Sequence, residues 1–507
     1  MSRFIPRRRL ALLAPVAVAA LAVFGAVPVT AGHSSRAVAM PAPRPAVSEF
    51  THLTSSTTPP SEADCYSAGR RCFTPQSLRA SYGVDRLIAA GKDGSGVTIA
   101  IVDSFGYPTV ASDLKVYSQQ FGLPMMCGFP GVTCTAGMPT FSELKIGNTQ
   151  VKAPPPGSKG TGQEARNIWA LEVALDVQMA HATAPGANIL LVTTPTAETL
   201  GVQGFPQMMN AEQYVIDHGL ADVISQSFGS GEEAFGSTQS LLNLRHAFIS
   251  AQAKGVTVFA SSGDGGTVNS YKEPVKNPRT IPFPSVIWPA SDPLVTAVGG
   301  TYLCTDAETG THVDSVNPGG KCPLYPGERE VAWTFSGGGF SHVFPRPAYQ
   351  NPATAPAGSY PYQSTRGIPD IAYQASAGTG PLIYDTAPGD VDSGLICPTG
   401  DPCSNGWYVV GGTSASAPQW AGLAAITDQI AGKRLGLIND DLYALAASSA
   451  TYAAAFYDIA TMNTNQTDTS IPGYPATPGW DPVTGLGTPA ADVLLPALAA
   501  AASTTAP

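Results

Sequence analysis

Short runs rich in β-branched residues alternate along this chain with segments of helical periodicity, and this alternation restricts the possible folds most strongly. The β-branched runs lie at 95–104, 187–194, 221–227, 255–264 and 293–300. Helical patterns lie between them at 162–182, 206–219 and 236–255, and the last two end at a glycine, as helices often do. Strand, helix and strand in that order predict an α/β fold, with a parallel sheet covered by helices on both faces.

The size and charge of the chain limit the classes of function. Its 507 residues suffice for one large domain or two ordinary ones. A net charge of −10, without a basic patch beyond the N-terminus, argues against nucleic acid or an anionic membrane as the main partner. From about 301 to 410 the chain is rich in Gly and Pro, which predicts loops with irregular β pieces, and we expect a last helix after the stretch GGTSASAP.

The N-terminus has the pattern of a signal peptide. Residues 1–31 contain a cationic start, an apolar stretch and small residues before Ala31, which predicts export and removal of this segment. A lone membrane anchor is the alternative, because the apolar run is long. Residues 32–74 are rich in Pro, Ser, Thr and Ala and lack apolar periodicity, which predicts a disordered linker or a short pro-segment. Order is expected to begin between Cys65 and Pro75.

Cysteine spacing predicts disulfides. In an exported chain the shortest loops cost least to close, so we expect neighbours to be bonded to each other, although other connectivities remain open. No pair has the Cys-x-x-Cys spacing of a zinc site. The eight cysteines form the close pairs Cys65 and Cys72, Cys127 and Cys134, Cys304 and Cys322, and Cys397 and Cys403.

A glycine turn before a helix presents a candidate nucleophile. In VVGGTSASAPQWAGLAA, residues 409–425, strand-like residues lead through Gly411 and Gly412 to Ser414. Glycines permit a sharp turn, and backbone N–H groups at the start of a helix favour a developing oxyanion. A purely structural turn is the alternative interpretation of this motif.

A serine nucleophile needs a base, and the sequence offers two acids in place of a histidine. No His-Gly-Thr motif occurs, and the one histidine near a recognisable motif, His181, is interpreted as a surface or capping residue. Glu172 and Asp176 are four residues apart and share a helix face among apolar neighbours. A shared proton would relieve their repulsion, and Glu172 could then accept a proton from Ser414 while Asp176 orients it. Two acids on an exposed helical stripe are the alternative.

Three separated motifs resemble the sedolisin family, the serine-carboxyl peptidases with a subtilisin-like fold, and more narrowly its kumamolisin-like members. These motifs are EVALDVQMAHATAPGANILLV, VTVFASSGDGG and the Gly-Thr-Ser turn. The resemblance implies a catalytic domain over 75–507 with a triad of Ser414, Glu172 and Asp176, and implies that Asp264 stabilises the oxyanion. A protonated carboxyl at Asp264 would donate a hydrogen bond there at acid pH. An ordinary subtilase triad with Asp103 and a histidine is a weaker alternative.

The resemblance also implies a calcium site near the C-terminus and a strand that binds substrate. Ser227, Phe228 and Gly229 are expected to line the substrate cleft through strand addition. Carboxylates and carbonyl oxygens suit calcium, although a loop without metal is the alternative. The residues that correspond to the family's single Ca²⁺ site are Asp458, Ile459, Thr477, Gly479 and Asp481.

Together these features predict a secreted, extracellular, calcium-binding peptidase that acts at acid pH through an acyl-enzyme, as an endopeptidase or a tripeptidyl-peptidase. Its partners would be polypeptide substrates, with no nucleic acid and no stable membrane association after removal of the signal, and it is expected to be a monomer. A catalytically inactive secreted binding protein on the same fold is the alternative from another class.

Overall fold

An eight-stranded sheet lies at the centre of the structure, a computed structural model in which residues 49–147, 161–195, 204–271, 279–314, 322–387, 405–461 and 464–504 are described. The predicted signal peptide lies outside these residues. All described residues belong to one compact unit.

The strand order of this sheet confirms the predicted parallel arrangement. It runs β11 (Glu330–Ala332), β10 (Thr296–Leu303), β8 (Thr257–Ser261), β6 (Val223–Gln226), β3 (Thr98–Ser104), β5 (Asn188–Thr194) and β4 (Phe141–Lys145), and β14 (Ile371–Gln374) also pairs with β10. All pairings are parallel except that of β10 with β11. Strand order reverses around β3, because β5 lies on one side of it and β6 on the other. In parallel sheets such a reversal, at the carboxyl ends of the strands, is a common place for a functional site.

Alternate residues of the central strands supply two separate hydrophobic cores. Ile99 and Ile101 of β3 pack into one core together with α5 (Thr161–Thr183) and α9 (Thr413–Ala431). Ala100 and Val102 point into the other, together with α6 (Phe205–Asp217) and α8 (His246–Lys254). This alternation follows from the two-residue period of a strand and explains why the strands read as continuous apolar runs.

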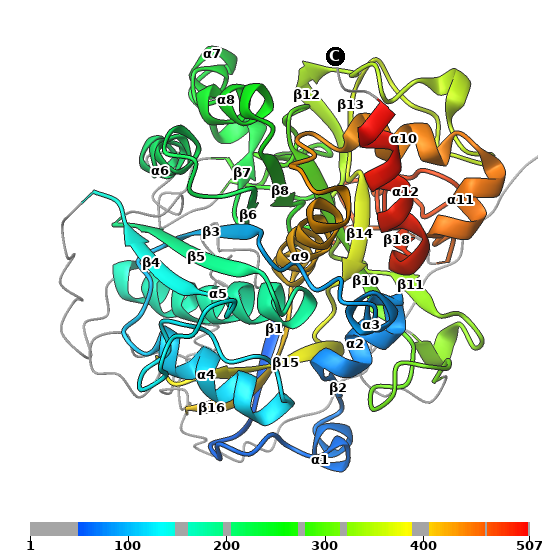
Figure 1. Cartoon of the computed structure of the whole chain (residues 1–507). Helices are drawn as coiled ribbons and strands as arrows, with labels where there is room; N and C mark the ends of the chain where they lie inside the picture. The colour runs from blue at the N-terminus through cyan, green and yellow to red at the C-terminus, as the bar shows by residue number, and fades with distance from the viewer. Residues whose placement is uncertain are drawn as a thin grey trace, which may run out of the picture. The chain divides into compact units, whose positions relative to one another are not determined.

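The two helices that carry the candidate triad pack directly against each other. α5 and α9 cross on one face of the sheet, and α9 also contacts β6, β8 and β10 (Figure 1). Gly422 of α9 permits the close approach, because a Cβ at this position would lie only 2.7 Å from Cβ of Thr183 on α5. The relative position of α5 and α9 therefore depends on this contact.

Several predicted helix boundaries differ from the structure. The pattern at 236–255 forms two helices, α7 (Thr238–Leu242) and α8, which are separated by Asn243–Arg245. The helix after the glycine turn already begins at Thr413 and continues through Pro418, which lies inside it and cannot donate a hydrogen bond to the carbonyl of Ser414. It is not the last helix, since α10 (Asn439–Ala446), α11 (Ser449–Ala455) and α12 (Ala491–Thr504) follow it.

Residues 49–74 are ordered, so a disordered linker is wrong for this part of 32–74, and order begins before the expected Cys65; a short pro-segment stays a prediction. β1 (Glu49–Thr54) pairs antiparallel with β16 (Gly406–Gly411) in a second sheet. This sheet also contains β15 (Thr379–Asp385) and β2 (Arg71–Phe73), in the order β1-β16-β15-β2. Backbone pairing of this kind requires no apolar periodicity, so composition did not indicate it. Segment 32–48 lies outside the described residues.

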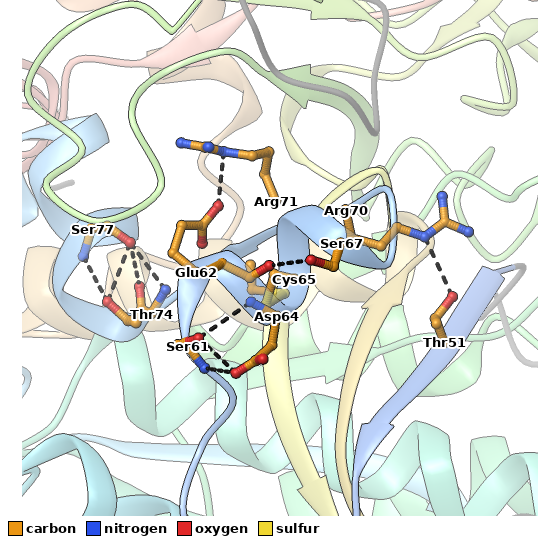
Figure 2. Close-up of a disulfide and its surroundings, with 12 residues drawn as sticks. Thr51, Ser61, Glu62, Asp64, Cys65, Ser67, Arg70, Arg71, Thr74 and Ser77 are labelled. Carbon is orange, nitrogen blue, oxygen red and sulfur yellow. Dashed lines mark hydrogen bonds and ion pairs between the residues drawn. A yellow bond between two sulfur atoms is a disulfide. The ribbon is translucent and has the colours of Figure 1, made fainter.

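The segment after β1 is held by local contacts that Figure 2 shows. α1 (Glu62–Ser67) begins at a capping box of Ser61 and Asp64, and the Cys65–Cys72 disulfide ties it to β2 (Arg71–Phe73). Arg71 Nε lies 2.9 Å from Glu62 Oε1, and Thr74 caps α2 (Pro75–Tyr82). These caps and the disulfide stabilise a polar segment that lacks a large apolar face.

Neighbouring cysteines are bonded as expected in three of the four pairs. The bridges are Cys65–Cys72, Cys127–Cys134 and Cys304–Cys322. The fourth pair, Cys397 and Cys403, lies outside the described residues.

The remaining helices and strands are short and connect or flank these layers. They are α3 (Val84–Ala89), α4 (Val110–Phe121), β7 (Ser230–Gly231), β9 (Ile287–Trp288), β12 (Gly339–Pro345), β13 (Thr365–Ile368), β15 (Thr379–Asp385), β17 (Phe456–Tyr457) and β18 (Thr488–Pro489).

The α5–α9 contact can be tested by adding one methyl group. Gly422→Ala should lower the free energy of unfolding by about 1–3 kcal/mol through overpacking against Thr183, although alanine alone favours a helix by about 1 kcal/mol. Denaturant unfolding measures this change. Gly236→Ala is the matched control, since nothing lies within 4 Å of a Cβ at that position. An equal or higher stability of Gly422→Ala would contradict close packing here.

Candidate active site

Ser414 lies in the first turn of α9, directly after the strand that leads to it. β16 ends at Gly411, and Gly412 at φ 144° and ψ 158° turns the chain into the helix. A side chain at φ 144° would be strained, which explains the glycine. The Ser414 side chain is buried, at a helix terminus whose N–H groups favour negative charge.

Glu172 and Asp176 project from the middle of α5 into the same buried region. Both side chains are fully buried, so the alternative of an exposed acidic stripe is excluded. Among the described residues no Lys, Arg or His forms an ion pair with either carboxyl. Two acids in an apolar helix face without a positive partner strongly disfavour ionisation.

A third acid, Asp103, belongs to the same cluster. It lies near the carboxyl end of β3, where strand order reverses, and it is also fully buried. Burial raises the pKa of Asp103 from 3.8 to about 8. Its negative charge would in turn raise the pKa values of Glu172 and Asp176, so the three carboxyls form one electrostatic unit.

The pKa values of the helix pair are raised, first by burial and then by their acidic neighbours. For Glu172 these neighbours are Asp176 and Asp103, while the Ser414 hydroxyl acts as a donor that lowers the pKa. For Asp176 the neighbour is Asp103, while the Ser227 hydroxyl and Glu172 act as donors that lower its pKa. Ser414, Glu172, Asp176 and Ser227 thus follow one another in this order as a chain of neighbouring groups.

The contacts along this chain are not formed hydrogen bonds in the structure. The side-chain oxygens of Ser414, Glu172, Asp176 and Ser227 make no bond of ordinary length. Active sites without substrate often show such loose contacts, which tighten when substrate binds. These side chains are nevertheless close enough to influence one another's pKa values.

Asp264 approaches the nucleophile from the loop after β8. Its Oδ1 accepts hydrogen bonds from Thr413 N at 2.8 Å and from Thr413 Oγ1 at 2.9 Å. Thr413 Oγ1 also accepts a bond from Gly263 N at 3.0 Å. The carboxyl is thus held one residue before Ser414, and its charge also acts on Glu172.

The predicted substrate-binding residues follow directly after β6, and the side chains of two of them point into the protein. Phe228 is fully buried in the aromatic cluster with Trp169 and Phe205, so its side chain faces the core. The Ser227 hydroxyl faces Asp176. Only the backbone of 227–229 is therefore available for strand pairing with a peptide.

The described histidines do not supply a base for a subtilase triad. His181 is buried, in contrast to the expected surface position, and its Nε2 lies 3.1 Å from the carbonyl oxygen of Pro124. Burial lowers the pKa of His181 to about 3. None of the described histidines is bonded to Ser414 or Asp103. The alternative subtilase triad therefore has no histidine base among the described residues.

Asp458 contacts the loop 477–481, which contains three of the other predicted calcium ligands. Gly479 N donates to both oxygens of Asp458, at 3.0 and 2.9 Å, and Thr477 N donates to Asp481 Oδ2 at 3.2 Å. Burial raises the pKa of Asp481 to about 7, and no ion pair with a described residue offsets its charge. Two carboxylates without a counter-charge are the type of ligand that a hard cation prefers. Among the described residues no cluster of three or more His, Cys, Asp or Glu side chains could hold a metal.

Comparison with known proteins identifies the class. The profile of the subtilase family of peptidases matches residues 162–474. Kumamolisin from Bacillus sp. (strain MN-32) is 30% identical over 453 residues, which cover 88% of this chain and 67% of that protein. Human tripeptidyl-peptidase 1 is 28% identical over 371 residues, which cover 66% of this chain and 53% of that protein.

A solved structure supports the fold. Pseudomonas sedolisin, a serine-carboxyl proteinase in complex with pseudo-iodotyrostatin, matches with a TM-score of 0.59 at 22% identity, over 86% of this chain and 99% of that chain. The chain therefore belongs to the sedolisin family, the serine-carboxyl peptidases within the subtilase class of hydrolases. It spans two thirds of kumamolisin and about half of tripeptidyl-peptidase 1. No described helix has the length and hydropathy needed to cross a bilayer.

Sequence reasoning missed two contributors to this site. Asp103 was weighed only as the aspartate of another triad, yet it lies in the carboxyl cluster; its position at the end of a central strand was the available signal. Thr413 was treated as part of a turn, although it holds Asp264. Its place directly before Ser414 was the only sequence signal.

Buried acids predict that stability decreases as pH rises. An acid with a raised pKa binds its proton more tightly in the folded protein, so the free energy of unfolding is highest below about pH 4 and falls as pH approaches 8. Asp103 and Asp385, each raised to about 8, should each remove about 1.4 kcal/mol per pH unit in this range. Chemical unfolding at several pH values measures the slope.

Asp385→Asn is the control for this assignment, because it removes one buried acid outside the carboxyl cluster. The variant should lose stability less steeply with pH. An unchanged slope, or a wild-type protein that becomes more stable toward pH 8, would contradict the assignment.

Proposed function

We propose that this chain is an acid-acting serine peptidase that hydrolyses peptide bonds through an acyl-enzyme. The observation that supports it best is the fully buried pair Glu172 and Asp176 beside Ser414, without a positive partner among the described residues. A carboxyl pair that shares one proton keeps one ionised, proton-accepting member at an acid pH where a histidine would be fully protonated. Membership in the sedolisin family supports the same reaction.

In the proposed reaction Ser414 Oγ attacks the scissile carbonyl carbon while Glu172 accepts the hydroxyl proton. Asp176 orients Glu172 and shares its negative charge, with Asp103 next to both. Collapse of the tetrahedral intermediate breaks the C–N bond, and Glu172 returns the proton to the departing amine. Water then attacks the acyl-enzyme by the same route in reverse, which releases the acid product and the free Ser414 hydroxyl.

The negative oxygen of the intermediate would be stabilised by Asp264 in its protonated form and by N–H groups at the start of α9. A neutral carboxyl donates a hydrogen bond, whereas an ionised one would repel the oxyanion. The need for a protonated Asp264 restricts activity to acid pH, and so does the buried cluster of Glu172, Asp176 and Asp103.

Substrate would pair with the backbone of Ser227, Phe228 and Gly229 as an added strand, because the Phe228 side chain faces the core. Kumamolisin and tripeptidyl-peptidase 1 are both relatives, so endopeptidase and tripeptidyl-peptidase action are both consistent with the family. Residues 1–31 as a signal peptide, and the disulfides, support a secreted protein.

One Ca²⁺ ion completes the proposal. Asp458 and Asp481 would bind it through carboxylates, and Ile459, Thr477 and Gly479 through carbonyls. The ion would stabilise the loop 477–481 and take no part in proton transfer.

Two variants test the triad against the alternative of an inactive binding protein. At about pH 4, Ser414→Ala and Glu172→Gln should each lower kcat on a casein digest or a fluorogenic peptide by roughly 10²–10⁴-fold. Glu212→Gln is the matched control, because Glu212 is an equally buried glutamate on α6, away from Ser414. A wild-type protein without activity at any pH would support the binding protein, and full activity of Glu172→Gln would contradict the triad.

Calcium is tested through stability. Addition of about 1 mM CaCl2 to desalted protein should raise Tm, because a ligand that binds only the folded state stabilises it by RT ln(1 + [L]/Kd). Asp458→Asn should abolish most of this rise while Asp217→Asn, a change at an exposed aspartate at the end of α6, keeps it. An equal rise in Asp458→Asn, or no rise in the wild type, would exclude calcium binding at this loop.

A further inference from the structure

Thr413 has a hydrogen-bond geometry that the proposed mechanism does not yet use. Its backbone N–H and its hydroxyl both bond to the same oxygen of Asp264, Oδ1, at 2.8 and 2.9 Å. The hydroxyl is itself an acceptor for Gly263 N at 3.0 Å, and Gly263 is the residue before Asp264. Thr413 thus contacts the Asp264 loop through three hydrogen bonds.

The direction of these bonds is fixed by the atoms involved. A backbone N–H can only donate, so Thr413 N and Gly263 N are donors in every protonation state. A hydroxyl has one proton, and with Gly263 N occupying one lone pair of Thr413 Oγ1, that proton points to Oδ1 of Asp264. Oδ1 therefore receives two donors.

An oxygen that receives two donors is a poor place for the acid's own proton. As the carbonyl oxygen of a neutral carboxyl, Oδ1 has two lone pairs and satisfies both donors. With a proton on Oδ1 only one in-plane lone pair remains, and one of the buried Thr413 donors would lose its acceptor. We infer that Thr413 fixes the proton of Asp264 on Oδ2 and so determines from which oxygen this acid donates.

This assignment gives Thr413 the role of a positioning residue, and it rests on the proposed role of Asp264 at the oxyanion. An oxyanion hole works because its donors are aimed before the reaction begins. A carboxyl whose proton could occupy either oxygen would present a donor only part of the time. Thr413 removes this ambiguity, one residue away from the nucleophile.

The inference is tested by removing only the hydroxyl donor. Thr413→Val keeps the shape and the backbone N–H, and should lower kcat by roughly three- to tenfold, as expected for one hydrogen bond, with KM changed less than about twofold. Thr413→Ser should restore kcat. If valine lowers Tm, Thr413→Ala provides the same deletion with less bulk.

A double-mutant cycle separates this role from a structural one. In an Asp264→Ala background the same Thr413→Val change should cost less than about twofold, because the partner through which Thr413 acts is gone. The affinity of a peptide aldehyde, which adds to a serine hydroxyl as a tetrahedral adduct, gives the same comparison by calorimetry where turnover is too slow to measure. An equal loss in both backgrounds, or no rescue by serine, would overturn the inference.

The cycle also separates the proposed oxyanion role of Asp264 from the role of Thr413 in fixing its proton. If Asp264→Ala keeps full activity and aldehyde affinity, the proposed oxyanion role fails, and the inference fails with it. If Asp264→Ala is impaired but Thr413→Val is additive with it, the oxyanion role stands and only the assignment of the proton to Oδ2 is wrong.

Discussion

The burial of three carboxyl groups in one place is the constraint on which the rest of the site depends. Glu172, Asp176 and Asp103 are fully buried; Asp176 and Asp103 raise the cost of ionising Glu172, and Asp103 raises that of ionising Asp176. In most proteins a buried acid is neutralised by a positive partner, whereas here protons must do so. The cluster therefore favours folding at acid pH, which is also the pH at which the proposed reaction takes place.

The fold brings these acids together from elements distant in sequence. Asp103 comes from the central strand at which strand order reverses, the helix pair from α5, and Ser414 from the start of α9. Because α5 and α9 touch through Gly422, the distance between base and nucleophile depends on helix packing rather than on a flexible loop. Rigid elements hold such groups more accurately than loops can.

Much of this could be predicted from the sequence, for identifiable reasons. The five parallel strands followed from continuous apolar runs, and the acid pair followed from two charges at helical spacing in an apolar segment. β1 was missed because backbone pairing leaves no side-chain pattern. The burial of His181 was missed because the sequence around a single polar residue does not reveal how it is packed. Thr413 was missed because a hydrogen bond to Asp264, 149 residues away in sequence, has no local signature.

The N-terminal strand has a consequence for how the sheet near Ser414 is protected. β1 covers one side of β16, whose other side pairs with β15, and β16 leads directly to the nucleophile. The Cys65–Cys72 bridge begins after β1, so only backbone pairing and a few side-chain contacts hold this strand in place. Loss of β1 would turn β16 into an exposed edge, able to pair with a strand from another molecule.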